Sequence, residues 1–152
     1  MASGPELTPE IASDIEQACL SFAAQRAARA IGRRYDAALR PTGLSNWQFT
    51  LLMMLVRDEA PTIGTLAHDL GTDRTTVTAN LKPLERRGLL AMQPDAEDRR
   101  IRRVMPTAKG RDLLRQAYPL WQEAQADCAG RLGKAGRDAF MFAVDALSIR
   151  KT

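Results

Sequence analysis

The sequence predicts a mainly α-helical domain with one short β-hairpin. Apolar residues recur at helical spacing through most of the chain, and two short apolar segments flank a charged turn, a pattern typical of a hairpin. Only 5% of the residues are aromatic, while alanine, leucine and arginine are abundant, which favours helices over strands. A length of 152 residues fits a single domain, 1–152.

The first expected element is one long amphipathic helix within residues 8–40. Apolar residues from Ile11 to Leu39 recur at close to helical spacing, with arginines between them. The helix should end near Arg40, because Pro41 disfavours helical geometry in the residue before it and Gly43 follows.

A second helix is expected from Asn46 to about Arg57, although its apolar run could also form a buried strand. Ser45 and Gln48 have the spacing of a capping box. Leu44 and Phe49 match the hydrophobic staple that accompanies such a cap. These paired signals favour the helix.

Two short helices joined by a glycine-containing turn are predicted next, which makes a helix-turn-helix. Thr62 can cap the first of them and Gly71 suits the left-handed turn that stops it. Either Thr72 or Asp73 can cap the second, which runs from about Arg74 to Gly88. Its buried face is expected to hold Val77, Leu81 and Leu84, and Pro83 should bend its last turn.

The hairpin is expected to pair residues 89–93 with 101–105 across the turn at 94–100. Thr107 can cap a long helix, kinked or offset near Pro119. Gly133 then separates it from a last helix that ends near Leu147. A helix-turn-helix followed directly by a hairpin is a winged helix, and the 44–106 segment holds all of it.

Charge points to a polyanionic partner. The net charge is +4, and residues 74–111 alone hold ten basic and four acidic side chains. No apolar run of membrane-spanning length and no signal peptide is present, so we expect a cytoplasmic protein with no membrane contact. Two cysteines and one histidine do not make a zinc site, so no metal or cofactor is expected. No catalytic motif or phosphate-binding loop is recognised, which argues against an enzyme.

The fourth helix and the hairpin carry the candidate DNA contacts. Hydroxyl, amide and guanidinium groups can bond to base edges and phosphates in the major groove, and an arginine on the hairpin can enter the minor groove. Asp98 could orient a neighbouring arginine, and Arg103 follows on the return strand. An ordinary solvated surface is the alternative interpretation of such charges. The candidate residues are Arg74, Thr75, Thr76, Thr78, Asn80 and Lys82 on the helix, and Asp98, Arg99, Arg100 and Arg102 on the hairpin.

The sequence resembles the MarR family of winged helix-turn-helix regulators. The resemblance is carried by GLSNWQF from Gly43, IGTLAHDLGTDRTTVTANLKPLERRGLL, DAEDRRIRRVMPTAKG, and LLRQAYPLWQEAQ after it. It implies a six-helix subunit that forms a homodimer through 8–40 and 107–152. It also implies that Asp98, Arg100 and the polar face of the recognition helix bind double-stranded DNA. Pro106 stands where the family usually has leucine, which questions the local hairpin pairing.

These features predict a regulator, of repressor type, that binds a pseudo-palindromic operator with half-sites about one helical turn apart. The resemblance implies release by a small aromatic effector or by cysteine oxidation. Phe22, Trp47 and Met53 could line an effector pocket, or could simply belong to the core. Cys19 is the candidate redox thiol, and a small buried hydrophobe is its alternative role. A regulator without a ligand and a helical protein-interaction module without specific DNA binding remain the alternatives.

Overall fold

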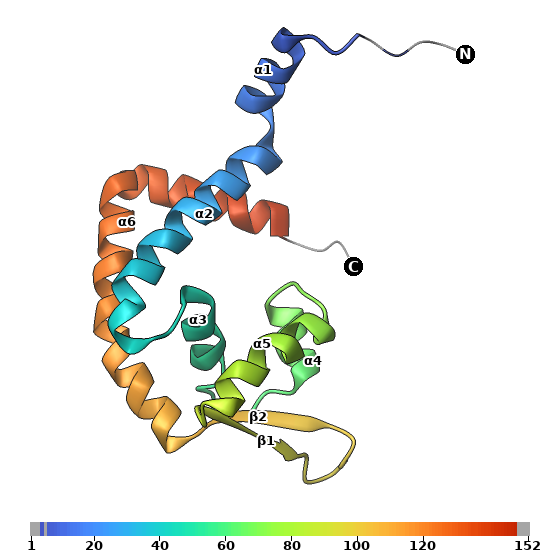
Figure 1. Cartoon of the computed structure of the whole chain (residues 1–152), viewed down its shortest axis with the longest axis vertical. Helices are drawn as coiled ribbons and strands as arrows, with labels where there is room; N and C mark the ends of the chain where they lie inside the picture. The colour runs from blue at the N-terminus through green and yellow to red at the C-terminus, as the bar shows by residue number, and fades with distance from the viewer. Residues whose placement is uncertain (1–3, 5, 149–152) are drawn as a thin grey trace. The chain divides into compact units, whose positions relative to one another are not determined.

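The computed structural model describes residue 4 and residues 6–148. It divides the chain into two compact units, Met1–Arg34 and Tyr35–Thr152, which are described separately below (Figure 1). The sequence predicted a single domain over 1–152, and that organisation stays a prediction.

The first unit contains two helices where the sequence predicted one. Helix α1 spans Pro9–Ala18, and α2 spans Leu20–Leu39, which continues into the second unit. Cys19 between them has an extended backbone, with φ −73° and ψ 109°. The prediction of one unbroken helix was therefore wrong. No proline or glycine marks the break, and Cys19 still donates its N–H to the Ile15 carbonyl at 3.0 Å, so few hydrogen bonds are lost there.

The second unit begins with the end of α2 and a 3-10 turn, η1, at Arg40–Thr42. Helix α3 spans Asn46–Met54 and begins with the predicted capping box, in which Ser45 and Gln48 bond each other's backbone N–H groups. It ends earlier than the predicted Arg57, because the Leu55 N–H turns back to the Leu52 carbonyl at 3.2 Å and tightens the last turn.

The helix-turn-helix forms as predicted. Helix α4 spans Ile63–Asp69 and is capped by Thr62, and Gly71 follows it with φ +62°. Helix α5 spans Arg74–Arg86 and is capped by Asp73, whose carboxylate accepts the Thr76 N–H at 2.8 Å. The sequence had left Thr72 and Asp73 open as caps. Helical structure continues through Pro83.

The hairpin pairs β1, Leu90–Pro94, with the antiparallel strand β2, Arg102–Pro106. Both strands lie one residue later in the sequence than predicted. Pro106 pairs opposite Leu90 at the end of the ladder, where a missing N–H can be tolerated. The Leu89 carbonyl accepts the Thr107 N–H at 3.1 Å, and this hydrogen bond joins the start of the hairpin to the next helix.

Helix α6 spans Ala108–Ser148, and its main interruption is at Gly133, with φ 65° and ψ 172°. This is the predicted division into a long helix and a last helix, and only glycine adopts that backbone region readily. Pro119 lies inside the first part. Within the second unit, Figure 1 shows the hairpin extending beside α4 and α5 while α6 leads away from β2.

Leucines from α3, α4, α5 and the hairpin form the core of the second unit. Leu52, Leu66 and Leu81 are completely buried. Trp121 of α6 stacks on Phe49 with 6.1 Å between ring centroids, which fastens α6 to α3. This core fixes the helix-turn-helix and the hairpin as one body.

Residue 4 and residues 6–148 include no helix with both the length and the apolar character that a membrane crossing requires. In the same part of the chain, no group of three His, Cys, Asp or Glu side chains could hold a metal ion.

Candidate nucleic-acid interface

Helix α5 separates its apolar and polar side chains as the sequence predicted. Val77, Leu81 and Leu84 are completely buried. The polar side chains that the sequence selected are exposed or half-buried on the rest of the helix surface. Exposed are Arg74, Thr75, Thr76 and Lys82, and half-buried are Thr78 and Asn80.

Three of these polar groups donate hydrogen bonds within their own helix. The Thr76 hydroxyl donates to the Asp73 carboxylate at 2.7 Å, the Thr78 hydroxyl to the Arg74 carbonyl at 2.7 Å, and the Asn80 amide to the Thr76 carbonyl at 2.8 Å. With these donors engaged, the two hydroxyl oxygens and the amide oxygen remain as acceptors, beside the threonine methyl groups. Such a surface suits the amino groups of adenine or cytosine and the thymine methyl group.

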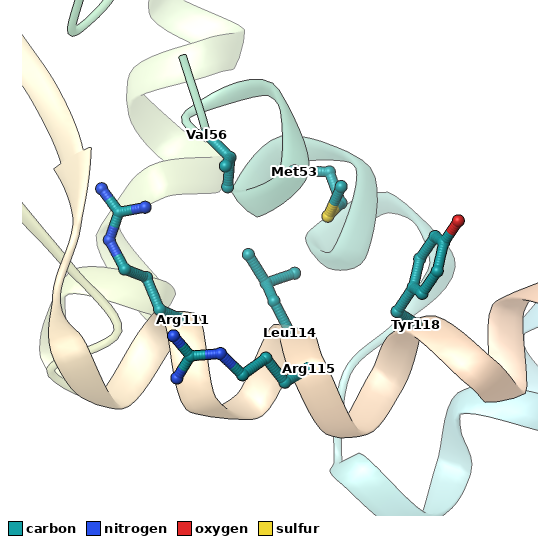
Figure 2. A pocket seen from close by; sticks show the side chains of 6 residues that line it. All are labelled: Met53, Val56, Arg111, Leu114, Arg115 and Tyr118. Atoms are coloured by element: carbon teal, nitrogen blue, oxygen red, sulfur yellow. The ribbon is translucent and has the colours of Figure 1, made fainter. Parts of the chain in front are cut away.

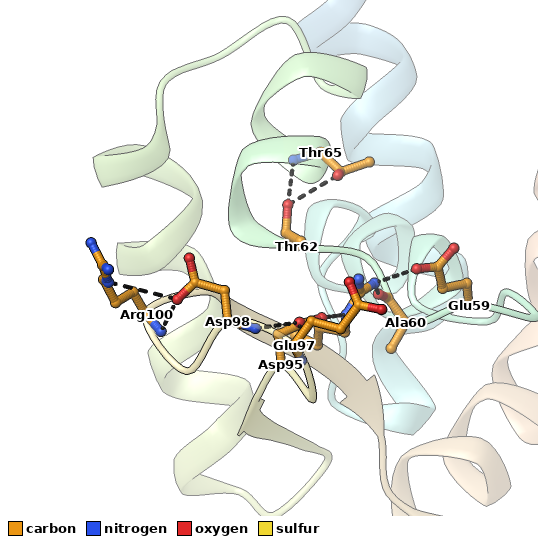
Figure 3. A network of polar contacts seen from close by, with 9 residues as sticks. Glu59, Ala60, Thr62, Thr65, Asp95, Glu97, Asp98 and Arg100 are labelled. Atoms are coloured by element: carbon orange, nitrogen blue, oxygen red, sulfur yellow. Dashed lines mark hydrogen bonds and ion pairs between the residues drawn. The ribbon is translucent and has the colours of Figure 1, made fainter.

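Asp98 orients Arg100 at the tip of the hairpin, as the sequence predicted. Its carboxylate accepts the Arg100 N–H at 2.9 Å and lies 3.7 Å from the Arg100 Nε (Figure 3). The Arg100 side chain is 95% exposed, so its charge is held in place without being buried. A guanidinium of this kind is available to a phosphate or to a narrow minor groove.

Helix α5, the recognition helix of the helix-turn-helix, meets the hairpin of β1 and β2, called the wing below, at a cleft of about 360 Å³. Arg74 of α5 and Arg100 and Arg102 of the wing line it, together with Gly64 at the start of α4. The Arg74 guanidinium lies only 3.0 Å from the place where a Cβ on Gly64 would be, so glycine lets it lie against α4. The cleft therefore concentrates arginines from both predicted parts of the interface.

Sequence reasoning missed a polar network at the base of the wing. Asp95 is buried, with 8% of its surface exposed, and its Oδ1 accepts the N–H groups of Glu97 at 2.8 Å and Asp98 at 3.0 Å (Figure 3). Its Oδ2 accepts from Arg103 Nε. The Asp98 N–H, the Arg103 side chain and the Glu97 N–H lower the pKa of Asp95 from 3.8 to about 2.

Arg103 does not join the exposed arginines of the hairpin that the sequence placed near DNA. Its guanidinium is bound by Asp95, by Glu59 and by the Ala60 carbonyl, and the Asp95 carboxylate raises the pKa of Arg103. The Pro94-Asp95 dipeptide at a turn was the available signal, because aspartate often accepts backbone N–H groups two and three residues on.

The candidate effector and redox residues are distributed over both units. Met53 lines a groove between α3 and α6. Trp47, also on α3, is 39% exposed. Phe22 belongs to the first unit and has the Arg26 guanidinium 5.6 Å from its ring centroid. Cys19 is half-buried at the break between α1 and α2. A common pocket for these residues stays a prediction.

The chain has a helix-turn-helix followed by a hairpin with arginines at its tip, and the two share one cleft. These features define a winged-helix protein of the nucleic-acid-binding type. Residues 44–101 match the MarR family. The structure is similar to that of the Mycobacterium tuberculosis transcriptional regulator MosR in complex with DNA, with 38% identity, coverage of 88% of this chain and 99% of that chain, and a TM-score of 0.74. The chain belongs to the MarR family of transcriptional regulators.

Other relatives agree with this assignment. The transcriptional repressor CouR bound to a 23-mer DNA duplex is 27% identical, with 95% of this chain and 100% of that chain covered and a TM-score of 0.80. The regulator TtmR of Methylorubrum extorquens is 34% identical over 62% of this chain and 48% of its own length. The HTH-type regulator YybA of Bacillus subtilis is 28% identical over 61% and 59%. The chain thus spans about half the length of these curated relatives.

Proposed function

We propose that this protein is a sequence-specific regulator that binds double-stranded DNA as a homodimer and acts as a repressor. The observation that carries the proposal is the shared cleft, in which Arg74 of the recognition helix lies with Arg100 and Arg102 of the wing. This arrangement allows α5 to read the major groove while the wing reaches the adjacent minor groove. Chromosomal DNA as the target implies a cytoplasmic location.

The polar face of α5 supplies the specificity in this proposal, and the arginines supply much of the affinity. Phosphate contacts position a protein on DNA, whereas base contacts select the sequence. Thr75, Thr78 and Asn80 are short enough to let the helix backbone approach the base edges. Arg99, Arg100 and Arg102 extend the positive surface along the wing, which suits the phosphate backbone.

Exposed apolar side chains support dimerisation through 8–40 and 107–152. Monomers rarely expose large contiguous apolar patches, so a cluster of exposed apolar residues indicates a covered surface. A two-fold dimer would present two recognition helices to half-sites about one helical turn apart. Exposed apolar residues in these two regions include Ile15 and Leu20 in the first unit, and Phe140, Met141, Phe142, Val144 and Leu147 near the end of the second.

A groove between α3 and α6 supports the proposal of a small aromatic effector. It has a volume of about 350 Å³, within the range of small-molecule sites. In Figure 2, Met53 and Val56 lie on the α3 side of the groove, and Leu114, Tyr118 and two arginines lie opposite them on α6. The two arginines are Arg111 and Arg115. Apolar walls with guanidinium groups at one side suit an aromatic ligand that carries an acidic group.

Because α6 connects directly to β2 through Thr107 and α3 packs on the same core, a ligand in this groove could bias the position of the wing. Phe22, Trp47 and oxidation at Cys19 remain alternative routes to release. An enzymatic activity is not part of the proposal. The alternative function is a helical protein-interaction module.

Selection of duplexes from a random pool, followed by fluorescence anisotropy at two salt concentrations and by sedimentation, tests the proposal. A dimer that enriches a palindromic site, with affinity that falls steeply with salt, is the expected result. Arg100→Ala should weaken binding, while Asp58→Ala, at an exposed position between α3 and α4 and outside the proposed dimerisation regions, should not. A monomer, or a dimer without sequence preference, would favour the interaction module. Titration of aromatic carboxylates into the complex then tests release.

A further inference from the structure

Arg103 connects the wing to the segment that precedes α4. Its Nη1 lies 2.7 Å from the Glu59 Oε1 and donates to the Ala60 carbonyl at 2.8 Å. Next to it, the Val104 N–H donates to the Pro61 carbonyl at 2.9 Å, and Arg103 forms a β-bridge with Thr62. Strand β2 is thus attached along residues 59–62 by both side-chain and backbone contacts.

Asp95 carries this attachment to the tip of the wing. One carboxylate oxygen accepts from Arg103 Nε, and the other accepts the N–H groups of Glu97 and Asp98. The Asp95 side chain is only 9% exposed, so water competes little for these bonds. Without its cation, the carboxylate would be a buried charge with fewer partners, a costly arrangement that the wing could relieve by opening.

Asp98, in turn, orients Arg100. The Asp98 N–H is bonded to Asp95, and its carboxylate accepts the Arg100 N–H. A chain of charge-assisted contacts therefore runs from Glu59 through Arg103 and Asp95 to Asp98 and Arg100 (Figure 3). Hydrogen bonds with an ionised partner are stronger than neutral ones. Residues 96–101 at the tip are all exposed, so apolar packing does little to hold it and these contacts take that role.

We propose that Arg103 is a positioning residue for DNA binding, which holds the wing tip in its DNA-binding conformation without contacting DNA itself. This inference rests on the proposed DNA-binding function. It gives two neighbouring arginines different roles. Arg102 lines the cleft and is exposed, whereas the Arg103 guanidinium is bound by three protein groups. Successive residues of a strand point to opposite faces, so the two side chains diverge.

The salt dependence of DNA affinity separates these roles. Each phosphate contact contributes about 0.9 to the slope of log K against log salt concentration. We expect Arg102→Ala to reduce the magnitude of this slope by about 1.8, because each of the two subunits of the dimer loses one contact with a phosphate. Arg103→Ala should leave the slope at the wild-type value and lower the affinity by roughly 10-fold at every salt concentration, as expected when a charged hydrogen-bond network is broken.

A slope that falls equally in both variants would overturn the proposal, since Arg103 would then contact DNA directly. An unchanged affinity in Arg103→Ala would also overturn it. Circular dichroism checks that the variant folds. Glu59→Gln is a second variant with little risk to the fold, because the Glu59 side chain is 80% exposed. It should give a smaller loss of affinity in the same direction, again with an unchanged slope.

Amide hydrogen exchange of the free protein supplies a readout that does not depend on DNA. The Glu97 and Asp98 amides should exchange faster in Arg103→Ala than in the wild type, and Arg102→Ala should leave their exchange unchanged. Equal exchange in all three proteins would contradict the inference even if the wild type binds DNA. If the wild type binds no DNA but Arg103→Ala still exchanges faster, the proposed DNA-binding function is refuted. In that case Arg103 still positions the wing tip.

Discussion

Gly110→Ala should destabilise the protein, because at this residue α6 passes very close to Leu89, the residue that precedes β1. A Cβ on Gly110 would lie 2.0 Å from the Leu89 carbonyl oxygen and 3.0 Å from its carbonyl carbon. The oxygen would have to move by about 1 Å to reach even a tight contact of 3.0 Å. That oxygen is backbone and cannot rotate away as a side chain can.

The same movement disturbs the junction between the hairpin and α6. The Leu89 carbonyl accepts the Thr107 N–H at 3.1 Å, and the Thr107 hydroxyl donates to the Gly88 carbonyl at 2.7 Å. Overpacking costs about 1–3 kcal/mol, and each weakened hydrogen bond about 1 kcal/mol. Alanine returns about 1 kcal/mol as the better helix former. We expect the free energy of unfolding to fall by about 2–4 kcal/mol.

Chemical and thermal denaturation at equal protein concentrations measure this change, and Gly130→Ala is the matched control. Gly130 lies in the same helix, and a Cβ there would meet nothing within 4 Å. This control should be neutral or more stable by up to about 1 kcal/mol. If Gly110→Ala were as stable as Gly130→Ala, the close approach of α6 to Leu89 would be wrong.

Two further predictions concern Asp95 and the cap of α5. The pKa of Asp95 in the folded protein, about 2, lies below its ordinary value of 3.8. The contribution of Asp95 to stability should therefore be present above pH 3.8 and lost as the pH falls through 2. Carboxyl-carbon NMR should show titration of Asp95 near pH 2, and titration near pH 4 would contradict the network. Asp73→Ala should lower the free energy of unfolding by about 1 kcal/mol, because the Thr76 N–H loses its cap. Urea denaturation beside Asp58→Ala, at an exposed position between α3 and α4, measures this change. Equal stability of the two variants would argue against the cap.

Local signals predicted much of the helix-turn-helix and of its helix starts. Ser45, Thr62 and Thr107 each accept a backbone N–H three residues on, an interaction that depends on a few neighbouring residues only. Gly71 adopts the predicted left-handed turn, and Gly133, at the predicted division between two helices, also has a positive φ. Helix ends and strand positions were less accurate, because the Leu55 turn and the hairpin register depend on packing against other elements.

The predicted DNA contacts were chosen by polarity and periodicity, and the structure decided how they are arranged. Thr76, Thr78 and Asn80 donate to their own helix, which their sequence positions had not indicated. The break at Cys19 has no glycine or proline to announce it.

By itself, the sequence determined the class of protein, because capping residues, apolar periodicity and turn residues act over distances of three or four positions. Only the tertiary structure decided that Arg102 lies in the cleft while Arg103 is held by Asp95 and Glu59. Glu59 and Arg103 are 44 positions apart, and no local pattern relates them. Asp95 is only 8% exposed, and a carboxylate removed from water requires a cation and hydrogen-bond donors beside it, which Arg103 and the N–H groups of Glu97 and Asp98 supply.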